Sequence, residues 1–281
     1  MKNAIKYYYG MNASKIISSN SNYYLLINGM NYLLYKCNIE DINNISLNGY
    51  HILISTLNNN KYIVFDNNYY VLLKLNTVIK KMEFHDLTNS IIYYGKGDIN
   101  WVNLWETHID YIENTIVDNY SKYDNLSNIV SYYIGLGENA IELLNISDIK
   151  NVDKYITHKR VKYNMNLTEL YNPLLVVIDT RVRDLAEYIK SEFFNTNISF
   201  DDIYNQILAF NLNSDEYILL FSRLLYPSYF FDLCDDAING HYDESKLESI
   251  VNKVDEYERL LRYIYIRIKK TTYIYDIDWL S

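Results

Sequence analysis

The chain has 281 residues, about half of them apolar, and a formal net charge of -9, which allows one large domain or two lobes that share a cleft. The negative charge and the lack of a Lys/Arg block argue against nucleic-acid phosphates as a partner and give no attraction to an anionic membrane. The longest apolar runs, such as 173–178, fall far short of the roughly 20 residues that a membrane-spanning helix needs, and two cysteines, Cys37 and Cys234, are too few for a disulfide framework or a zinc cluster.

The N-terminal segment is not typical of a targeting sequence. Residues 1–10 place Lys6 and three tyrosines where a secretory signal peptide needs an uninterrupted apolar stretch followed by small residues. We therefore expect the protein to be cytoplasmic when it is made.

The first third of the chain predicts an antiparallel sheet. Tyr23–Ile27 and Met30–Cys37 flank Asn28-Gly29, the pair that most readily takes positive φ at both central positions of a tight hairpin turn. Further strands are predicted at His51–Leu57, Lys61–Phe65 and Tyr69–Leu75, with runs of Asn and Asp between them. We expect a meander of about five strands.

After Asn76 the apolar spacing changes from two to three and four, which is typical of amphipathic helices. This spacing predicts helices over 101–116, 129–143, 181–194 and 244–269. Two more are predicted over 199–212, from a Ser199 cap with acids in the first turn, and over 214–226, which Pro227 stops. The run Leu174–Ile178, which ends in Asp179, predicts one buried strand among them. The expected fold is α+β, with a small antiparallel sheet lobe (1–76) and a larger, mainly helical lobe (77–281).

Three segments of the helical half resemble a known family. These are SYYIGLGENAIELL (Ser131–Leu144), PLLVVIDTRVRDLAEYIK (Pro173–Lys190) and LLYPSYFFDL (Leu224–Leu233). They are similar to the spore-coat-associated kinase-like family of endospore-forming bacteria, the CotS and YutH group, within the aminoglycoside phosphotransferase and protein-kinase-like superfamily. The resemblance implies a protein-kinase-like two-lobe fold, a place in the spore coat, and other spore coat proteins as partners.

The same resemblance implies a set of site residues. Phosphoryl transfer in this superfamily needs a lysine on the phosphates, a catalytic Asp, and an Asn and an Asp that hold magnesium. Asp179 in VVID matches the magnesium-binding position, although Asp also caps helices well. Asp184 in RDLA matches the acid that holds the catalytic loop, and Lys36 in YLLYKC is the candidate for the phosphates, unless it is a solvated strand residue.

The catalytic loop departs from the family pattern. His158-Lys159-Arg160, with Asn164 or Asn166 beyond it, matches the loop, but Arg160 replaces the catalytic Asp. A cation cannot accept the substrate proton, and the loss of a general base removes a factor of about 10² to 10⁴ in rate. The expected phosphate cradle is also poor, because the hairpin at Gly29 has a two-residue turn.

Two hypotheses about function follow. The first is a degenerate, non-catalytic kinase-like protein that acts in spore coat assembly through protein contacts. The alternative is an active phosphotransferase that uses ATP and Mg²⁺. In either case Lys36, His158, Asn166 and Asp179 should converge in a cleft, with Arg160 paired to Asp179 or another acid. The sequence specifies no catalytic residue and no oligomeric state.

Overall fold

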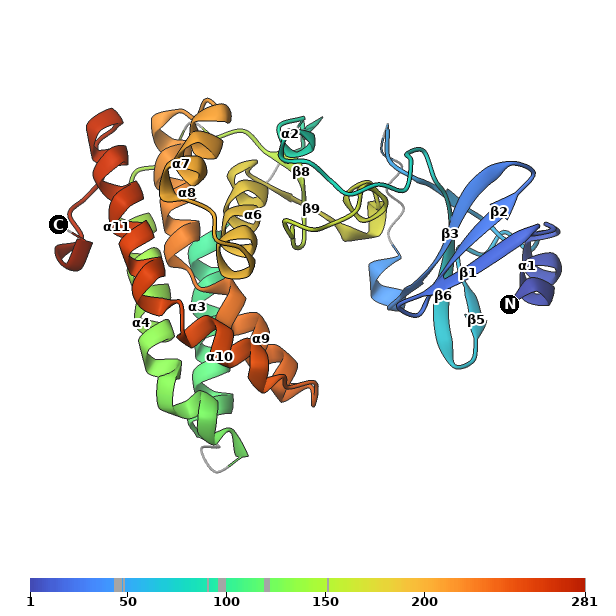
Figure 1. Ribbon diagram of the computed structural model, residues 1–281, viewed down its shortest axis with the longest axis horizontal. Helices are drawn as coiled ribbons and strands as arrows, with labels where there is room; N and C mark the ends of the chain where they lie inside the picture. The colour runs from blue at the N-terminus through green and yellow to red at the C-terminus, as the bar shows by residue number, and fades with distance from the viewer. Residues whose placement is uncertain are drawn as a thin grey trace. The chain divides into compact units, whose positions relative to one another are not determined.

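A computed structural model describes residues 1–42, 47, 49–89, 91–95, 100–118, 122–150 and 152–280 (Figure 1). The chain forms two compact units, one made of residues 1–82 and 164–177 and the other of residues 83–163 and 178–281. None of the helices in the described residues has both the length and the hydropathy that crossing a bilayer requires.

The first unit is built on a six-stranded antiparallel sheet. Its elements are α1 (Lys2–Tyr9), β1 (Lys15–Ser19), β2 (Asn22–Ile27), β3 (Met30–Cys37), β4 (Ile52–Ile54), β5 (Ile63–Phe65) and β6 (Asn68–Lys74). The turn between β2 and β3 has φ of 49° at Asn28 and 76° at Gly29, which confirms the predicted hairpin. Helix α1 and strand β1 were not predicted.

The predicted meander is wrong in its strand order. The sheet runs β1-β2-β3-β6-β4, and β5 also pairs with β6. Strand β3 pairs with one edge of β6 from Tyr32↔Lys74 to Cys37↔Tyr69. The other edge of β6 is shared, because β4 and β5 have three residues each and seven-residue β6 has room for both.

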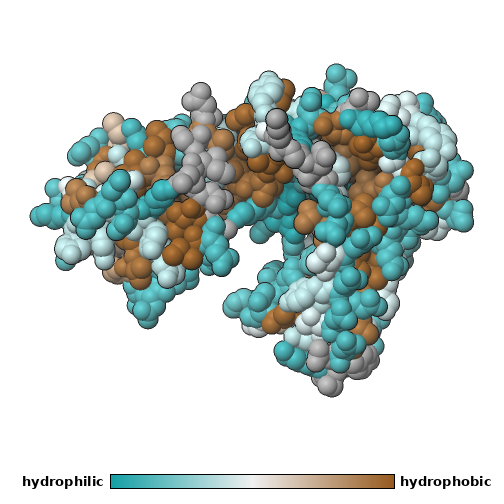
Figure 2. Space-filling model, turned by 180° about the vertical axis from the view of Figure 1, so that it is seen from behind, coloured by the Kyte–Doolittle hydropathy of each residue, from teal (hydrophilic) through white to brown (hydrophobic). Residues whose placement is uncertain are grey.

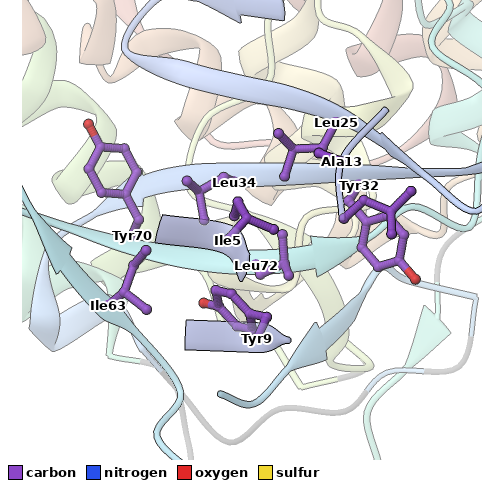
Figure 3. Packing of buried hydrophobic residues seen from close by; sticks show 10 residues of the cluster. Ile5, Tyr9, Ala13, Leu25, Tyr32, Leu34, Ile63, Tyr70 and Leu72 are labelled. Atoms are coloured by element: carbon purple, nitrogen blue, oxygen red, sulfur yellow. The ribbon is translucent and has the colours of Figure 1, made fainter. Parts of the chain in front are cut away.

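The central strands β3 and β6 are buried on both faces over their middle residues, which explains their continuous apolar runs. On one face, Ile5 and Tyr9 of α1 pack with Leu34 and Leu72 (Figure 3). Successive strand residues point to opposite faces, so the neighbours of these leucines form the other core. That core joins Leu33, Val71 and Leu73 to Leu174, which comes from the 164–177 segment.

Hydrogen bonds fix the 164–177 segment to the sheet unit. His51 is 3% exposed, and its Nε2 lies 3.1 Å from the carbonyl oxygen of Thr168. Its Nδ1 accepts a hydrogen bond from the backbone N–H of Asn76 at 3.2 Å. The ring is therefore neutral, with its proton on Nε2. The segment contains α5 (Leu167–Leu170) and the short helix η4 (Pro173–Leu175).

The second unit is mainly helical. Its helices are α2 (Phe84–Leu87), α3 (Trp101–Ile112), α4 (Asp124–Ile146), α6 (Val182–Asn195), α7 (Phe200–Ala209), α8 (Ser214–Leu225), α9 (Ser228–Ile238), α10 (Glu244–Val251) and α11 (Val254–Thr271). Helix α8 packs against α4, α6 and α11 (Figure 1). Because it is covered on several sides, its polar residues Glu216, Ser222 and Arg223 are buried along with its apolar ones and need internal partners.

Three predictions about this unit need correction. The single strand is part of a three-stranded sheet, β7 (Ile91–Ile92), β8 (Tyr155–His158) and β9 (Val176–Asp179), in that order. The helix predicted over 101–116 ends at Ile112 and continues as a π-helical turn. The long C-terminal helix is broken into α10 and α11. Lys253, between them, donates from Nζ to the carbonyls of Phe193 and Thr196 at the end of α6.

Candidate functional site

The strand-ending carboxylate of Asp179 is buried among hydrogen-bond donors. Arg223 donates from Nη2 to both carboxylate oxygens, at 2.7 and 2.6 Å. Arg183 donates from Nη1 to Oδ2 at 2.9 Å. The indole N–H of Trp101 and the backbone N–H of Thr180 donate to Oδ1 at 2.9 and 2.7 Å. Asp179 is 3% exposed, so the carboxylate is enclosed and saturated.

The charges around Asp179 keep it ionised. Burial, the largest single effect, raises the pKa of this carboxyl. The guanidiniums of Arg223 and Arg183 and the hydrogen bonds from Trp101 and Thr180 together hold the pKa below its ordinary value. Arginine stays protonated in proteins. Two cations therefore face one buried anion, which stays ionised between them.

Arg183 also ties Asp179 to the segment that follows β8. Its Nε donates to the carbonyl of His158 at 2.9 Å, and its Nη2 donates to the carbonyl of Lys159 at 3.0 Å. Asp184 accepts from the backbone N–H of His158 at 2.9 Å and from its Nδ1–H at 2.7 Å. In this geometry Asp184 holds the His158 loop, as the resemblance implied.

Arg160 pairs with an acid other than Asp179. Its Nε donates to Oδ2 of Asp232 at 2.7 Å, and its Nη2 bonds to Oδ1 of the same carboxylate. Glu187 lies 3.8 Å from Nε. Burial by itself lowers the pKa of Arg160, but these two acids outweigh burial and raise it. The bidentate pair keeps a cation where the family pattern has a catalytic base.

A second buried ion pair lies further along α6. Lys190 is 3% exposed, and its Nζ lies 2.7 Å from Glu187. Ser228 donates to Glu187 at 2.8 Å, and Lys190 donates to the carbonyls of Arg223 and Tyr226 at 3.2 and 3.4 Å. Burial raises the pKa of Glu187, but Lys190 and then Arg160 lower it to about 2. The helical unit thus holds a second buried ion pair, Glu187 with Lys190, in addition to Asp179 with its arginines.

The residues around Asp179 do not fit a magnesium ion. Mg²⁺ prefers octahedral oxygen ligands at about 2.0–2.1 Å, usually carboxylates and waters. Here two guanidiniums and an indole N–H occupy the lone pairs that a cation would use. Across the described residues, no three His, Cys, Asp or Glu side chains gather as metal ligands. Asp179 also does not cap α6, whose cap position is Arg181.

Lys36 lies in the first unit, exposed near the end of β3. Its backbone N–H donates to the side-chain oxygen of Asn22 at 2.8 Å. It borders a hollow of about 420 Å³ lined by Asn20, Ser21, Asn22, Tyr35, Lys36, Cys37, Asn38, Leu174 and Leu175. The turn here is Asn20-Ser21, both with positive φ. Gly29 belongs to the next hairpin, between β2 and β3, and so does not contribute to this turn.

Asn166 begins α5 in the first unit. It forms a capping box with Glu169, whose Oε2 accepts from the Asn166 backbone N–H at 3.1 Å. It also makes an isolated bridge to Lys81. The structure thus brings His158 and Asp179 together through Arg183 within one unit. The convergence of Lys36 and Asn166 with this pair is a relation between units and stays a prediction.

Sequence reasoning missed the donors that enclose Asp179. Arg223 lies in LLFSRLLYP, a nearly apolar stretch of α8. A charged residue among buried apolar neighbours must have an internal partner, so this pattern was a usable signal. Trp101 is the first residue of α3, and its place in the sequence gave no comparable signal.

The fold is the kinase-like fold, which the aminoglycoside phosphotransferases also have. A solved aminoglycoside phosphotransferase from Alicyclobacillus acidocaldarius matches it with a TM-score of 0.66, covering 96% of this chain and 97% of that chain at 11% identity. This likeness concerns the fold alone.

The particular family follows from the sequence. Residues 6–264 match the family described as spore coat putative kinase YutH, and the chain belongs to this family. The endospore coat-associated protein YutH of Bacillus subtilis is 27% identical over 231 residues, which cover 71% of this chain and 67% of that protein.

Proposed function

We propose that this protein is a kinase-like member of the spore coat that carries out no phosphoryl transfer and contributes to coat assembly through protein contacts. The observation that carries the proposal is the closed carboxylate of Asp179, bonded to Arg223 and Arg183. Opening it for a metal ion would leave two guanidiniums without their acceptor. Breaking a buried pair in this way costs about 3–5 kcal/mol.

Arg160 supports the same proposal independently. A phosphotransferase needs a group that accepts the proton of the attacking hydroxyl, and a guanidinium held by Asp232 cannot do so. Loss of the base and loss of the metal ligand affect separate steps. A substitution that restores the base would therefore still leave the protein without the metal ligand. The name of the Bacillus subtilis relative supports a place in the endospore coat. In this proposal the partners are other coat proteins, and the protein is made in the cytoplasm beforehand.

The alternative is an ATP-dependent phosphotransferase. The hollow beside Lys36, with its volume of about 420 Å³, is the observation in its favour, because pockets for small ligands commonly enclose about 300–1,000 Å³. In this alternative Lys36, His158 and Asn166 hold ATP and Asp179 exchanges its arginines for Mg²⁺.

A thermal-shift titration separates the two. The purified protein is melted with ATP, with Mg²⁺ and with both, because a ligand at about 100 times its dissociation constant stabilises the native state by roughly 2.7 kcal/mol. We expect no shift at millimolar nucleotide. A saturable shift that needs both ATP and Mg²⁺, and that Lys36→Met abolishes while Lys61→Met retains it, would overturn the proposal.

Localisation tests the coat role separately. A fluorescently tagged copy should move from the cytoplasm to the periphery of the forming spore during sporulation. The variant Arg160→Asp should localise in the same way, since no catalysis is needed. A uniform cytoplasmic signal in vegetative cells and in spores alike would contradict the coat assignment.

A further inference from the structure

A hollow on the second unit lies between α4 and α11, far in sequence from Asp179. It has a volume of about 420 Å³, and the short helix η5 (Asp278–Leu280) contributes Trp279 to its lining. Its aromatic walls are held in place: Tyr132 donates from its hydroxyl to Glu258 at 2.6 Å, and Trp279 donates from its indole N–H to Asn139 at 3.3 Å. The hollow is therefore a preformed site.

The glycine in its lining has no packing reason in the monomer. Gly135 lies inside the 23-residue helix α4, where glycine is less favourable than alanine. A Cβ built at Gly135 meets no described atom within 4 Å, whereas one at Gly137 would lie 2.7 Å from Ile109 Cδ1. Gly137 is thus explained by close packing, and Gly135 leaves open space where an external group can approach the helix backbone.

The rim charges of the hollow cancel. Asp255 and Glu258 contribute two negative charges, and Arg259 and Arg262 contribute two positive ones. Such a rim does not select a net cation or anion, while Tyr132 and Trp279 offer faces and edges for ring packing. The chemistry fits an uncharged aromatic side chain.

The same chain exposes a matching segment. Ile91, Ile92, Tyr93 and Tyr94 are four consecutive apolar residues with exposed fractions of 40%, 41%, 37% and 91%. On the face seen in Figure 2, hydrophobic patches lie among hydrophilic ones. Runs of this kind on a surface are unusual unless they meet a partner. The other highly exposed rings, Tyr7 and Tyr273, pack edge-on against Tyr8 and Tyr275.

We propose that Tyr94 of one copy inserts over Gly135 of a second copy, so that the 91–94 segment is the contact by which this chain associates with itself. The anchor and the hollow are different surfaces of one unit. A single contact uses Tyr94 (the anchor) of one copy and the hollow of the other, so each copy keeps one unused surface. These two surfaces either meet in a reciprocal dimer or bind further copies and extend the assembly. This deepens the surface role proposed above, and its test needs neither nucleotide nor spores, so that its failure leaves that role standing.

The test uses the full chain and two complementary variants. Gly135→Leu fills the hollow but keeps the anchor, and Tyr94→Ser removes the anchor but keeps the hollow. Sedimentation velocity over a concentration series should show self-association of the wild type, weakened by at least about tenfold in each variant, as expected for an anchor contact. Mixing the two variants should restore one contact and give a 1:1 heterodimer that does not grow further.

Matched controls separate binding from folding. Glu138→Leu adds the same side chain to the exposed face of α4 outside the hollow, and Tyr7→Ser removes an exposed ring from the other unit. Both should associate as the wild type does, and all variants should keep the wild-type circular dichroism spectrum. A monomeric wild type at every concentration, equal association of all variants, or a mixture that stays monomeric would each overturn the proposal.

Discussion

Asp179→Asn tests whether the buried carboxylate is a structural anion or a metal ligand. The amide keeps the shape of the carboxylate, but it loses the charge and presents an N–H₂ to donors on one side. Arg223, with 7% of its side chain exposed, and Arg183, with 21%, then lose their counter-ion. Removing one partner of a buried pair costs about 3–5 kcal/mol. A loss of 3 kcal/mol lowers Tm by roughly 6–12 °C in a domain of this size.

The measurement is urea unfolding at neutral pH, with Glu142→Gln on the exposed face of α4 as the control for losing one carboxylate. A double variant, Asp179→Leu with Arg223→Met, should recover most of the loss, since apolar replacement of both partners is often nearly neutral. In a true metal site the free carboxylate repels its neighbouring ligands, so Asp179→Asn would stabilise the metal-free protein. A stable Asp179→Asn protein would therefore refute the reasoning.

The pH dependence adds a second readout. The pKa of Asp179 is held below its ordinary value of 3.8, so the unfolded chain takes up this proton first as the pH falls. The stabilisation is complete above about 3.8 and is lost as pH falls through the folded-state pKa. Asp179→Asn should remove this part of the acid unfolding curve and leave the neutral region flat.

Burial lowers the pKa of His51 from 6.5 to about 4. Its contribution to the free energy of unfolding is therefore complete above pH 6.5, and up to about 3 kcal/mol is lost as the pH falls from 6.5 to 4. His51→Gln should flatten stability over that interval, and an unchanged pH profile of Tm would contradict this. Gly135→Ala should stabilise the protein by up to about 1 kcal/mol, because the new Cβ enters open space. Gly137→Ala should stabilise it less, because its Cβ would lie 2.7 Å from a buried isoleucine. Equal melting temperatures of the two variants would contradict the open space at Gly135. Arg160→Asp should yield no ATP turnover in a phosphate-release assay, because Asp179 remains paired, and measurable turnover would show that the missing base alone blocks catalysis.

Local signals in the sequence predicted local structure well. The hairpin at Asn28-Gly29 followed from the backbone freedom of those two residues, and α6 followed from three-to-four spacing. Helices α7 and α8 followed from the Ser199 cap with its acidic first turn and from the stop at Pro227. The sheet order did not follow, because the pairing of β3 with β6 joins strands more than thirty residues apart in a chain with several apolar strands of similar pattern. Helix α1 was missed because its eight residues include three consecutive tyrosines, which favour strand as readily as helix.

Part of the site could also be predicted from local signals in the sequence. Asp179 was expected to end a strand with a basic residue nearby, since a buried acid needs a counter-charge. Arg160 was the candidate on grounds of position in the motif, yet Arg223 and Arg183 make the contacts and Arg160 bonds to Asp232. Which arginine reaches which acid depends on how α6, α8 and α9 pack, and no spacing rule in one sequence contains that information.

The placement of residues 164–177 in the sheet unit has a consequence for synthesis on the ribosome. Leu33, Val71 and Leu73 are translated early, but Leu174, which completes their core, follows only after residues 83–163 have been made. At roughly 5–20 residues per second, the delay between residues 82 and 177 is about 5–19 s. During that time the nascent sheet offers an unfinished apolar face, which is the kind of surface that chaperones protect from aggregation.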